Sequence, residues 1–255
     1  MKTLKTTLLL AILVLLSPIF SNAQEESKRQ AYVFHNDPVF PSKISEYETV
    51  AKNLTDECKK HKTKAGWATF QMNGSNFVYV SPLKNMGELD ENIFADLQQK
   101  MGKEAFSSMF DEFDKYYNSH TDYIMILDKE LSYMPKGLNI TPEGLNYRNN
   151  TLFYFAPKDY DKAIQVAKDF KNLYASKGST QYYRVYLSGF GTNGSYLMVA
   201  EASKSAADFQ KAEAENLVLL GDEANTIYSR LLDIVLKTET ITGYMRPDLS
   251  YLPKQ

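Results

Sequence analysis

The sequence cannot form an internal disulfide bond, because Cys58 is its only cysteine. It also lacks the close His and Cys spacings that are typical of a zinc site, since His35, His61 and His120 lie far apart in the chain. We therefore expect no metal site, and stability must come from a packed core. A hydrophobic content of 44% and an aromatic content of 13% are sufficient for such a core.

An excess of positive charge is also lacking. The chain has a formal net charge of −2, with 29 Lys and Arg residues scattered among 31 Asp and Glu residues. Nucleic-acid-binding proteins normally present a basic face that displaces counterions from phosphates. Anionic membranes attract the same kind of surface. We therefore expect neither nucleic acid nor a membrane surface as a partner.

Long apolar runs are absent except near the N-terminus. There, Lys2 and Lys5 precede 14 mainly apolar residues from Thr7 to Phe20, and small residues follow up to Ala23. This pattern is typical of a secretory signal peptide, and the run is shorter than the roughly 20 residues of a membrane-spanning helix. We expect residues 1–23 to be a signal peptide. The mature protein is then exported, to a periplasmic or extracellular location, with no membrane segment.

An internal repeat organises the rest of the chain. The hexapeptide LSYMPK at 131–136 returns as LSYLPK at 249–254, and Asn-Gly-Ser at 73–75 returns at 193–195. The two offsets are 118 and 120 residues, so the register is nearly constant. One structural unit is therefore used twice.

The repeat predicts the domain boundaries. The first unit spans 29–136, the second spans 146–255, and a linker at 137–145 is rich in turn-forming residues. We expect an insertion in this linker to be tolerated better than one in either Asn-Gly turn.

Each unit shows the same order of predicted elements. An opening strand is followed by an amphipathic helix, a hairpin with an Asn-Gly turn, a long helical region divided at Gly102 or Gly221, and a last strand. The order β-α-β-β-α-β is that of the ferredoxin-like unit. The apolar residues that indicate the first helix recur at helical spacing: Tyr47, Val50, Ala51, Leu54 and Cys58.

Two such units in one chain resemble the dimeric α/β-barrel superfamily with both protomers fused. The expected fold class is α+β, with two tandem ferredoxin-like units packing sheet to sheet. The superfamily includes small monooxygenases, stress-response barrel proteins and haem-handling enzymes, so the resemblance makes haem a candidate cofactor. It rests on element order and duplication, and it transfers no active-site residue.

Arg184 is a candidate ligand-binding residue. It alternates with Tyr182 and Tyr186 along a predicted strand, so the three side chains share one face of the sheet. If the opposite face meets the helices, Arg184 and Tyr186 point into the space between the sheets, where a cation amid aromatic walls suits an anionic ligand. Arg184 could equally pair with Glu201 or Asp248.

His35, Trp67 and Arg246 complete the candidate ligand-binding set. His35 ends an opening strand, and its approximate counterpart in the second unit is Phe155. One unit could thus have gained a ligand-binding or proton-transferring side chain, although an exposed histidine at a strand edge is the alternative. Arg246 lies near the end of the last strand.

Two other features favour structural roles. Residues 189–194 fit the dinucleotide-binding pattern G-x-G-x-x-G, but a strand-like segment follows them, so we expect a hairpin turn. Cys58 shares the apolar stripe of its helix, and we expect it in the core.

The sequence leaves three functions open. The favoured one is an exported protein, monomeric or weakly homo-oligomeric, that binds a small, partly apolar ligand between its two sheets without catalysis. The second is a cofactor-independent monooxygenase or haem-processing enzyme with a pocket around His35, Trp67 and Arg184. The third is a structural or interaction protein.

Overall fold

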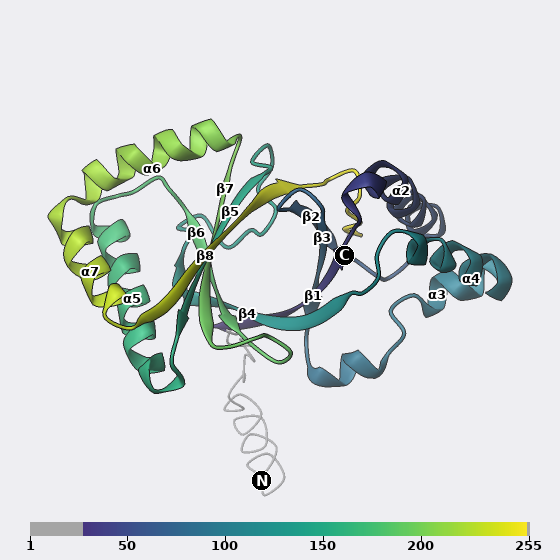
Figure 1. Ribbon diagram of the computed structural model, residues 1–255, viewed down its shortest axis with the longest axis horizontal. Helices are drawn as coiled ribbons and strands as arrows, with labels where there is room; N and C mark the ends of the chain where they lie inside the picture. The colour runs from purple at the N-terminus through teal and green to yellow at the C-terminus, as the bar shows by residue number, and fades with distance from the viewer. Residues whose placement is uncertain (1–27, 254–255) are drawn as a thin grey trace, which may run out of the picture.

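The computed structural model describes residues 28–253, which form an α+β structure. Eight strands close into one antiparallel barrel, and the helices lie outside it in two groups on opposite sides (Figure 1). The predicted signal peptide at 1–23 lies outside the described residues. Within 28–253, no helix has the length and apolar character needed to cross a membrane.

The two halves of the chain contain the same elements in the same order. The first half contains β1 (Arg29–Pro38), α2 (Ile44–His61), β2 (Ala68–Met72), β3 (Asn76–Leu83), α3 (Ala95–Met101), α4 (Lys103–Asp111) and β4 (Thr121–Tyr133). The second half contains β5 (Tyr147–Phe155), α5 (Tyr160–Ser176), β6 (Tyr183–Ser188), β7 (Tyr196–Ser203), α6 (Ala206–Leu220), α7 (Asp222–Leu232) and β8 (Val235–Met245). Four short 3-10 helices complete the described elements: η1 (Pro41–Lys43), η2 (Met86–Asp90), η3 (Phe113–Lys115) and η4 (Pro157–Asp159).

The helical regions divide where the sequence predicted. Gly102 separates α3 from α4 and Gly221 separates α6 from α7, with φ angles of 86° and 65°. Such angles are accessible to glycine without steric cost, and they break the helical hydrogen-bond ladder.

The strand order around the barrel is β1-β3-β2-β8-β5-β7-β6-β4. Each half thus contributes four neighbouring strands, and the halves are joined by the antiparallel pairs β2–β8 and β4–β6. The predicted α/β barrel is confirmed, although its two sheets join edge to edge, whereas we expected them to pack face to face. The edge strands of the two halves hydrogen-bond to each other, so the barrel leaves no unpaired edge.

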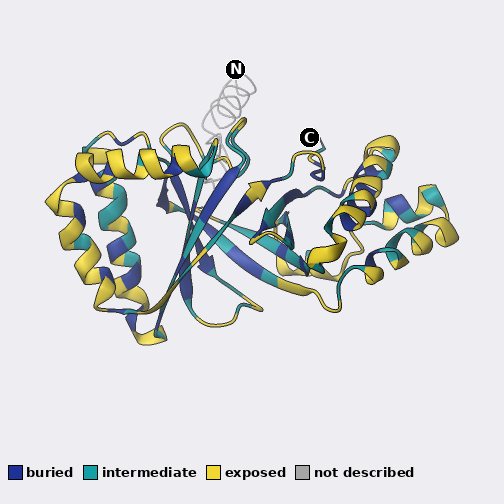
Figure 2. Cartoon of the chain, turned by 45° about the horizontal axis from the view of Figure 1, so that its top comes forward, coloured by how far each residue is buried: buried dark blue, intermediate teal, exposed yellow. Residues whose placement is uncertain are grey.

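Successive side chains along each strand point alternately into the barrel and toward the helices, and this separates an inner core from two outer cores. The outer core of the first half packs the strands against α2 and includes the fully buried Tyr47 and Phe77. That of the second half lies between the strands and α5. Figure 2 shows the result, with buried residues on the strands and exposed residues on the outer helix faces. The inner core comprises Phe34, Val80, Met125, Leu127, Leu152, Tyr186, Tyr196, Met198 and Ala200.

Both structural interpretations of local motifs are confirmed. Cys58 is buried in the outer core of the first half. The G-x-G-x-x-G segment forms the turn between β6 and β7, and a Cβ atom on Gly189 would lie 2.5 Å from the carbonyl oxygen of Ile124. Gly189 therefore permits the close approach of β4, and no helix follows the motif to bind a phosphate.

Candidate ligand-binding site

The interior of the barrel contains a cavity of about 250 Å³. Most of its wall is apolar or aromatic and comes from the inner core. Two arginines, Arg148 on β5 and Arg184 on β6, also line it, and one carboxylate, Glu239 on β8, forms an ion pair with Lys237. The interior therefore combines an apolar wall with two cations and with one anion that already has a partner.

Arg184 is buried, with 3% of its surface exposed. It donates hydrogen bonds to the carbonyl oxygens of Asn139 at 3.0 Å and Ala200 at 3.2 Å, and its buried Nε has no partner. Burial lowers its pKa. No ion pair with Glu201 or Asp248 forms, so both predicted pairings were wrong. Only neutral carbonyls hold this cation.

Arg148 is a second buried cation in the cavity, with 2% of its surface exposed. It donates to the carbonyl oxygens of Leu145, Tyr147 and Ile140, while its Nε is also buried without a partner. Burial, together with the charge of Arg184, lowers its pKa to about 9. Among the described residues, no salt bridge involves either arginine.

Arg148 was not among the residues predicted from the sequence, although a signal was present. It alternates with Asn150 and Leu152 along β5, and all three line the cavity. The Oδ1 atom of Asn150 is likewise buried without a hydrogen-bond partner. Strand alternation would have placed Arg148 inside the barrel as it placed Arg184.

The segment predicted as a linker contributes to this site. Leu138 and Ile140 pack against the inner core, and Ile140 lines the cavity. The carbonyl oxygens of Asn139, Ile140 and Leu145 are the acceptors that hold the two arginines. The connection between the halves therefore also shapes the interior cavity.

A second, larger cavity of about 590 Å³ lies on the outer side of the first half. It lies beside β1 and β3, and residues from η2 to the segment before β4 complete its wall. Its aromatic residues are Trp67, Tyr79, Phe94, Phe110, Phe113 and Tyr117. Its polar wall contains His35, Asp37, His120 and Asp122.

His35 lies between two carboxylates on this polar wall. Its Nδ1 is 2.8 Å from Asp122 Oδ1, and its Nε2 is 3.0 Å from Asp37 Oδ1. Burial alone would lower the pKa of His35, but the hydrogen bonds and charges of Asp37 and Asp122 outweigh it and raise the pKa to about 9. The hydroxyl of Tyr47 donates to Asp37 Oδ2 at 2.6 Å. These contacts fix His35 and Asp37 in one orientation.

Similar solved structures share little sequence with this chain. An anthrone oxidase-like protein has a TM-score of 0.55 at 13% identity, and the match covers 87% of this chain and 92% of the other. Putative monooxygenases from Fusobacterium nucleatum and Lactobacillus acidophilus have TM-scores of 0.52 and 0.50 at 11% and 10% identity. These matches cover 85% and 90% of this chain and 92% and 100% of the others. The chain has the dimeric α/β-barrel fold. No family model and no curated protein matches the sequence.

In this dimeric α/β barrel, the five predicted site residues occupy three separate places. Arg184 and Tyr186 line the interior cavity, as their alternation predicted. His35 and Trp67 line the outer cavity, on the other side of the barrel wall. Arg246 lines neither cavity and forms ion pairs with Glu48 and Asp248. The predicted pocket that joins His35, Trp67 and Arg184 is therefore not formed.

Trp67 and Arg246 make contacts that stabilise the fold. The indole Nε1 of Trp67 donates to the carbonyl oxygen of Leu249 at 3.0 Å, which joins β2 to the C-terminal segment. Arg246 also donates to Gln71 Oε1 at 2.8 Å. Hydrogen bonds to Asp248 and Glu48 raise the pKa of Arg246, although burial opposes them, and keep it charged.

Proposed function

We propose that this protein binds a small organic anion, a carboxylate with a short apolar tail, in the interior cavity. The observation that carries the proposal is the pair Arg148 and Arg184, two buried guanidinium groups that form no salt bridge among the described residues and whose buried Nε atoms have no acceptor. The apolar remainder of the wall suits the tail of such a molecule.

The energetic argument concerns charge. A buried ion that lacks a counter-charge costs about several kcal/mol, and the two arginines also repel each other. Water could accept the remaining hydrogen bonds, but it cannot neutralise the charge. A carboxylate could accept from both Nε atoms and offset the repulsion, and charge-assisted hydrogen bonds of this kind are the stronger ones. An anion therefore stabilises the site more than water does.

Titration calorimetry with hexanoate, and with hexan-1-ol as the uncharged control, tests this proposal. We expect hexanoate to bind and hexan-1-ol to bind at least tenfold more weakly. Arg184→Met and Arg148→Met should each weaken hexanoate binding at least tenfold, whereas Arg230→Met, which changes a surface ion pair with Asp169, should leave it unchanged. Absence of binding by hexanoate, or equal binding by the two arginine variants and the native protein, would exclude the proposal and favour a structural or interaction role.

We propose oxygenation of an electron-rich aromatic molecule as a second candidate function, located in the outer cavity. Its support is the aromatic wall beside the His35 and Asp37 cluster, together with a fold shared with putative monooxygenases and an anthrone oxidase-like protein. Oxygen uptake in the presence of anthrone or a quinol tests it. We expect consumption that Trp67→Ala reduces; no uptake above the protein-free rate would rule it out.

Haem, which the resemblance implied as a cofactor, fits these residues poorly. An imidazole is a common axial ligand of haem iron. No histidine of residues 28–253 lines the interior cavity, and in the outer cavity Asp37 Oδ1 lies 3.0 Å from His35 Nε2, where a porphyrin ring around an iron bound to that nitrogen would overlap the carboxylate. We assign no role to haem. A Soret shift on haem titration that His35→Ala abolishes would overturn this assignment.

We further propose that the protein is exported, that it acts as a monomer, and that its halves are duplicated ferredoxin-like units. The N-terminal sequence supports export, and the shared element order supports duplication. A barrel completed within one chain needs no second copy to close it. The N-terminal sequence of the secreted protein, expected to begin at Gln24, and the mass in solution test the first two statements; an unprocessed N-terminus or a stable dimer would contradict them.

A further inference from the structure

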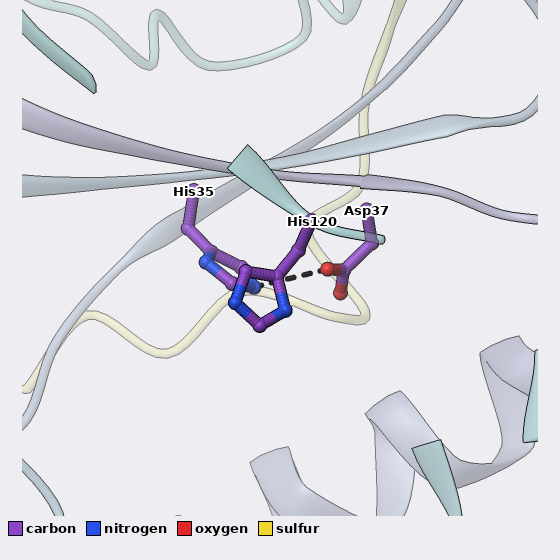
Figure 3. A group of neighbouring side chains, drawn as sticks. All are labelled: His35, Asp37 and His120. Atoms are coloured by element: carbon purple, nitrogen blue, oxygen red, sulfur yellow. Dashed lines mark ion pairs between the residues drawn. The ribbon is translucent and has the colours of Figure 1, made fainter. Parts of the chain in front are cut away.

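Three potential metal ligands converge on the wall of the outer cavity. One ligand atom each of His35, Asp37 and His120 lie within 4.8 Å of one another. Figure 3 shows Asp37 pointing toward the two imidazole rings. His35 and Asp37 share one face of β1, and His120 immediately precedes β4, which pairs with β1. The β1–β4 pairing therefore brings together residues that the sequence separates.

Neighbouring groups hold two of the three ligands in position. Asp122 Oδ1 lies 2.8 Å from His35 Nδ1, which directs Nε2 toward Asp37. Metal-bound histidines commonly have such a carboxylate on the opposite nitrogen. The Tyr47 hydroxyl donates a hydrogen bond of 2.6 Å to Asp37 Oδ2.

The second carboxylate oxygen of Asp37 provides an independent observation. The Asp37 side chain is only 3% exposed, and its buried Oδ1 atom has no partner apart from the ion pair with His35 Nε2. This atom points at the cluster and lies 3.0 Å from His35 Nε2. A metal ion would take the place of the proton between His35 Nε2 and Asp37 Oδ1, and it would leave the carboxylate bound to a cation.

We propose that His35 Nε2, Asp37 Oδ1 and His120 bind a divalent first-row transition-metal ion. Bonds of about 2.0–2.2 Å place neighbouring ligand atoms about 3.0–3.5 Å apart. His35 and Asp37 already have this separation, and the exposed side chain of His120 has to approach them. Two imidazoles and one carboxylate suit zinc or ferrous iron and leave coordination positions open toward the cavity.

The charge of the cavity favours a cation. Its wall contains no lysine or arginine among the described residues. The carboxylates that line it are Asp37, Glu88, Glu91, Asp111, Asp114 and Asp122. Such a surface raises the local concentration of cations.

The second half of the barrel lacks this arrangement. The two halves align here with an offset of 116 residues, because η1 and α2 begin at Pro41 and Ile44, and η4 and α5 begin at Pro157 and Tyr160. Thr151 and Phe153 therefore stand where the first half has His35 and Asp37. The site is therefore specific to the first half.

Metal binding by the full mature chain, stripped with EDTA, tests the proposal. Calorimetry with Zn²⁺ and the visible absorption spectrum with Co²⁺ are the two readouts. We expect one equivalent of each ion to bind, with Co²⁺ bands typical of nitrogen and oxygen ligands. We expect metal binding to weaken at least tenfold in each of the ligand variants His120→Ala, His35→Gln and Asp37→Asn. Asp122→Asn changes the residue that contacts the other ring nitrogen of His35, and it should weaken binding about 10–100-fold.

Matched control variants distinguish the loss of the metal site from a general effect on folding. His61→Ala removes a histidine that pairs with Glu57 on α2, and it should leave binding unchanged. His120 is exposed, so His120→Ala tests the site even where Asp37→Asn impairs folding. No binding to the native protein, or binding that His120→Ala leaves unchanged, would overturn the proposal. Hexanoate binding in the interior is independent of this result.

Discussion

Ser132 and Ser250 make the same pair of hydrogen bonds at the two places where the halves of the barrel join. Each hydroxyl donates at 2.7 Å to the carbonyl oxygen four residues earlier. Ser132 also accepts from the amide of Val185 on β6, and Ser250 accepts from the amide of Thr69 on β2, both at 2.9 Å. The repeated hexapeptide therefore joins each half of the chain to the other half.

The neighbours of these serines have equivalent roles too. Tyr133 donates from its hydroxyl to the carbonyl oxygen of Ser179, and Tyr251 donates to that of Thr63, both at 3.0 Å. The leucine that begins each hexapeptide is 1% exposed. The repeated hexapeptide therefore has the same structural role in both halves of the chain.

Replacing either serine should weaken the closure of the barrel. In Ser132→Ala the buried amide of Val185 loses its acceptor, and in Ser250→Ala the same holds for Thr69. We expect each variant to lower the free energy of unfolding by about 1–3 kcal/mol. The two sites lie at different junctions, so the double variant should show roughly the sum.

Urea unfolding measures these effects, with Ser108→Ala as the control on an exposed face of α4. The control should change stability by no more than about 0.5 kcal/mol. Serine variants as stable as the control would show that the junctions do not depend on these hydrogen bonds.

The sequence predicts well which side chains of a strand point into the barrel. The positions of Arg184 and Tyr186 inside the barrel follow from a period of two residues, which needs no knowledge of the partner strand. The order of elements also follows, because turn residues and helical spacing are local signals. The same alternation, extended to Trp67 one residue before β2, would have placed this side chain on the outer face, so the predicted pocket that joins Trp67 and Arg184 was wrong.

Residues brought together by strand pairing are not predictable in this way. His35 and His120 meet because β1 pairs with β4 in a register that opposes His35 to Asp122. That register depends on the whole barrel, and no spacing rule for metal sites covers ligands 85 residues apart. The closure of β2 on β8 and of β4 on β6 likewise depends on contacts between the halves.

The effect of an insertion in the linker should depend on its position. Glu143 and Gly144 are exposed, whereas the carbonyl oxygens of Asn139 and Ile140 hold the buried arginines. We expect Gly-Ser-Gly inserted after Glu143 to change stability by less than about 1 kcal/mol, because lengthening a loop adds little closure entropy. The same insertion after Asn139 should reduce hexanoate binding.

Urea unfolding and calorimetry compare these variants with an insertion between Asn73 and Gly74. That insertion breaks the tight turn between β2 and β3, and it should destabilise the protein more than either linker insertion. Equal losses at all three places would contradict the greater tolerance predicted for the linker.

Glu201 should make stability depend on pH near neutrality. Burial, with a smaller contribution from the charge of Glu213, raises the pKa of Glu201 from 4.5 to about 7, although hydrogen bonds from Asn149 and Gln181 and the charge of Arg184 oppose this. The folded state then holds the proton to higher pH than the unfolded state. Its contribution to stability is complete below pH 4.5 and is lost as pH rises through 7.

Glu201→Gln removes this titration. We expect the native protein to lose up to about 3 kcal/mol relative to the variant between pH 4.5 and 8, in urea unfolding at several pH values. Glu215→Gln, at an exposed position, should show no such trend. The sign of this change in stability with pH also tests the interior site. A hydrogen-bonded ion pair with Arg184 would instead hold the pKa of the Glu201 carboxyl low, and the native protein would gain stability from acid to neutral pH; the expected loss argues against such a pair.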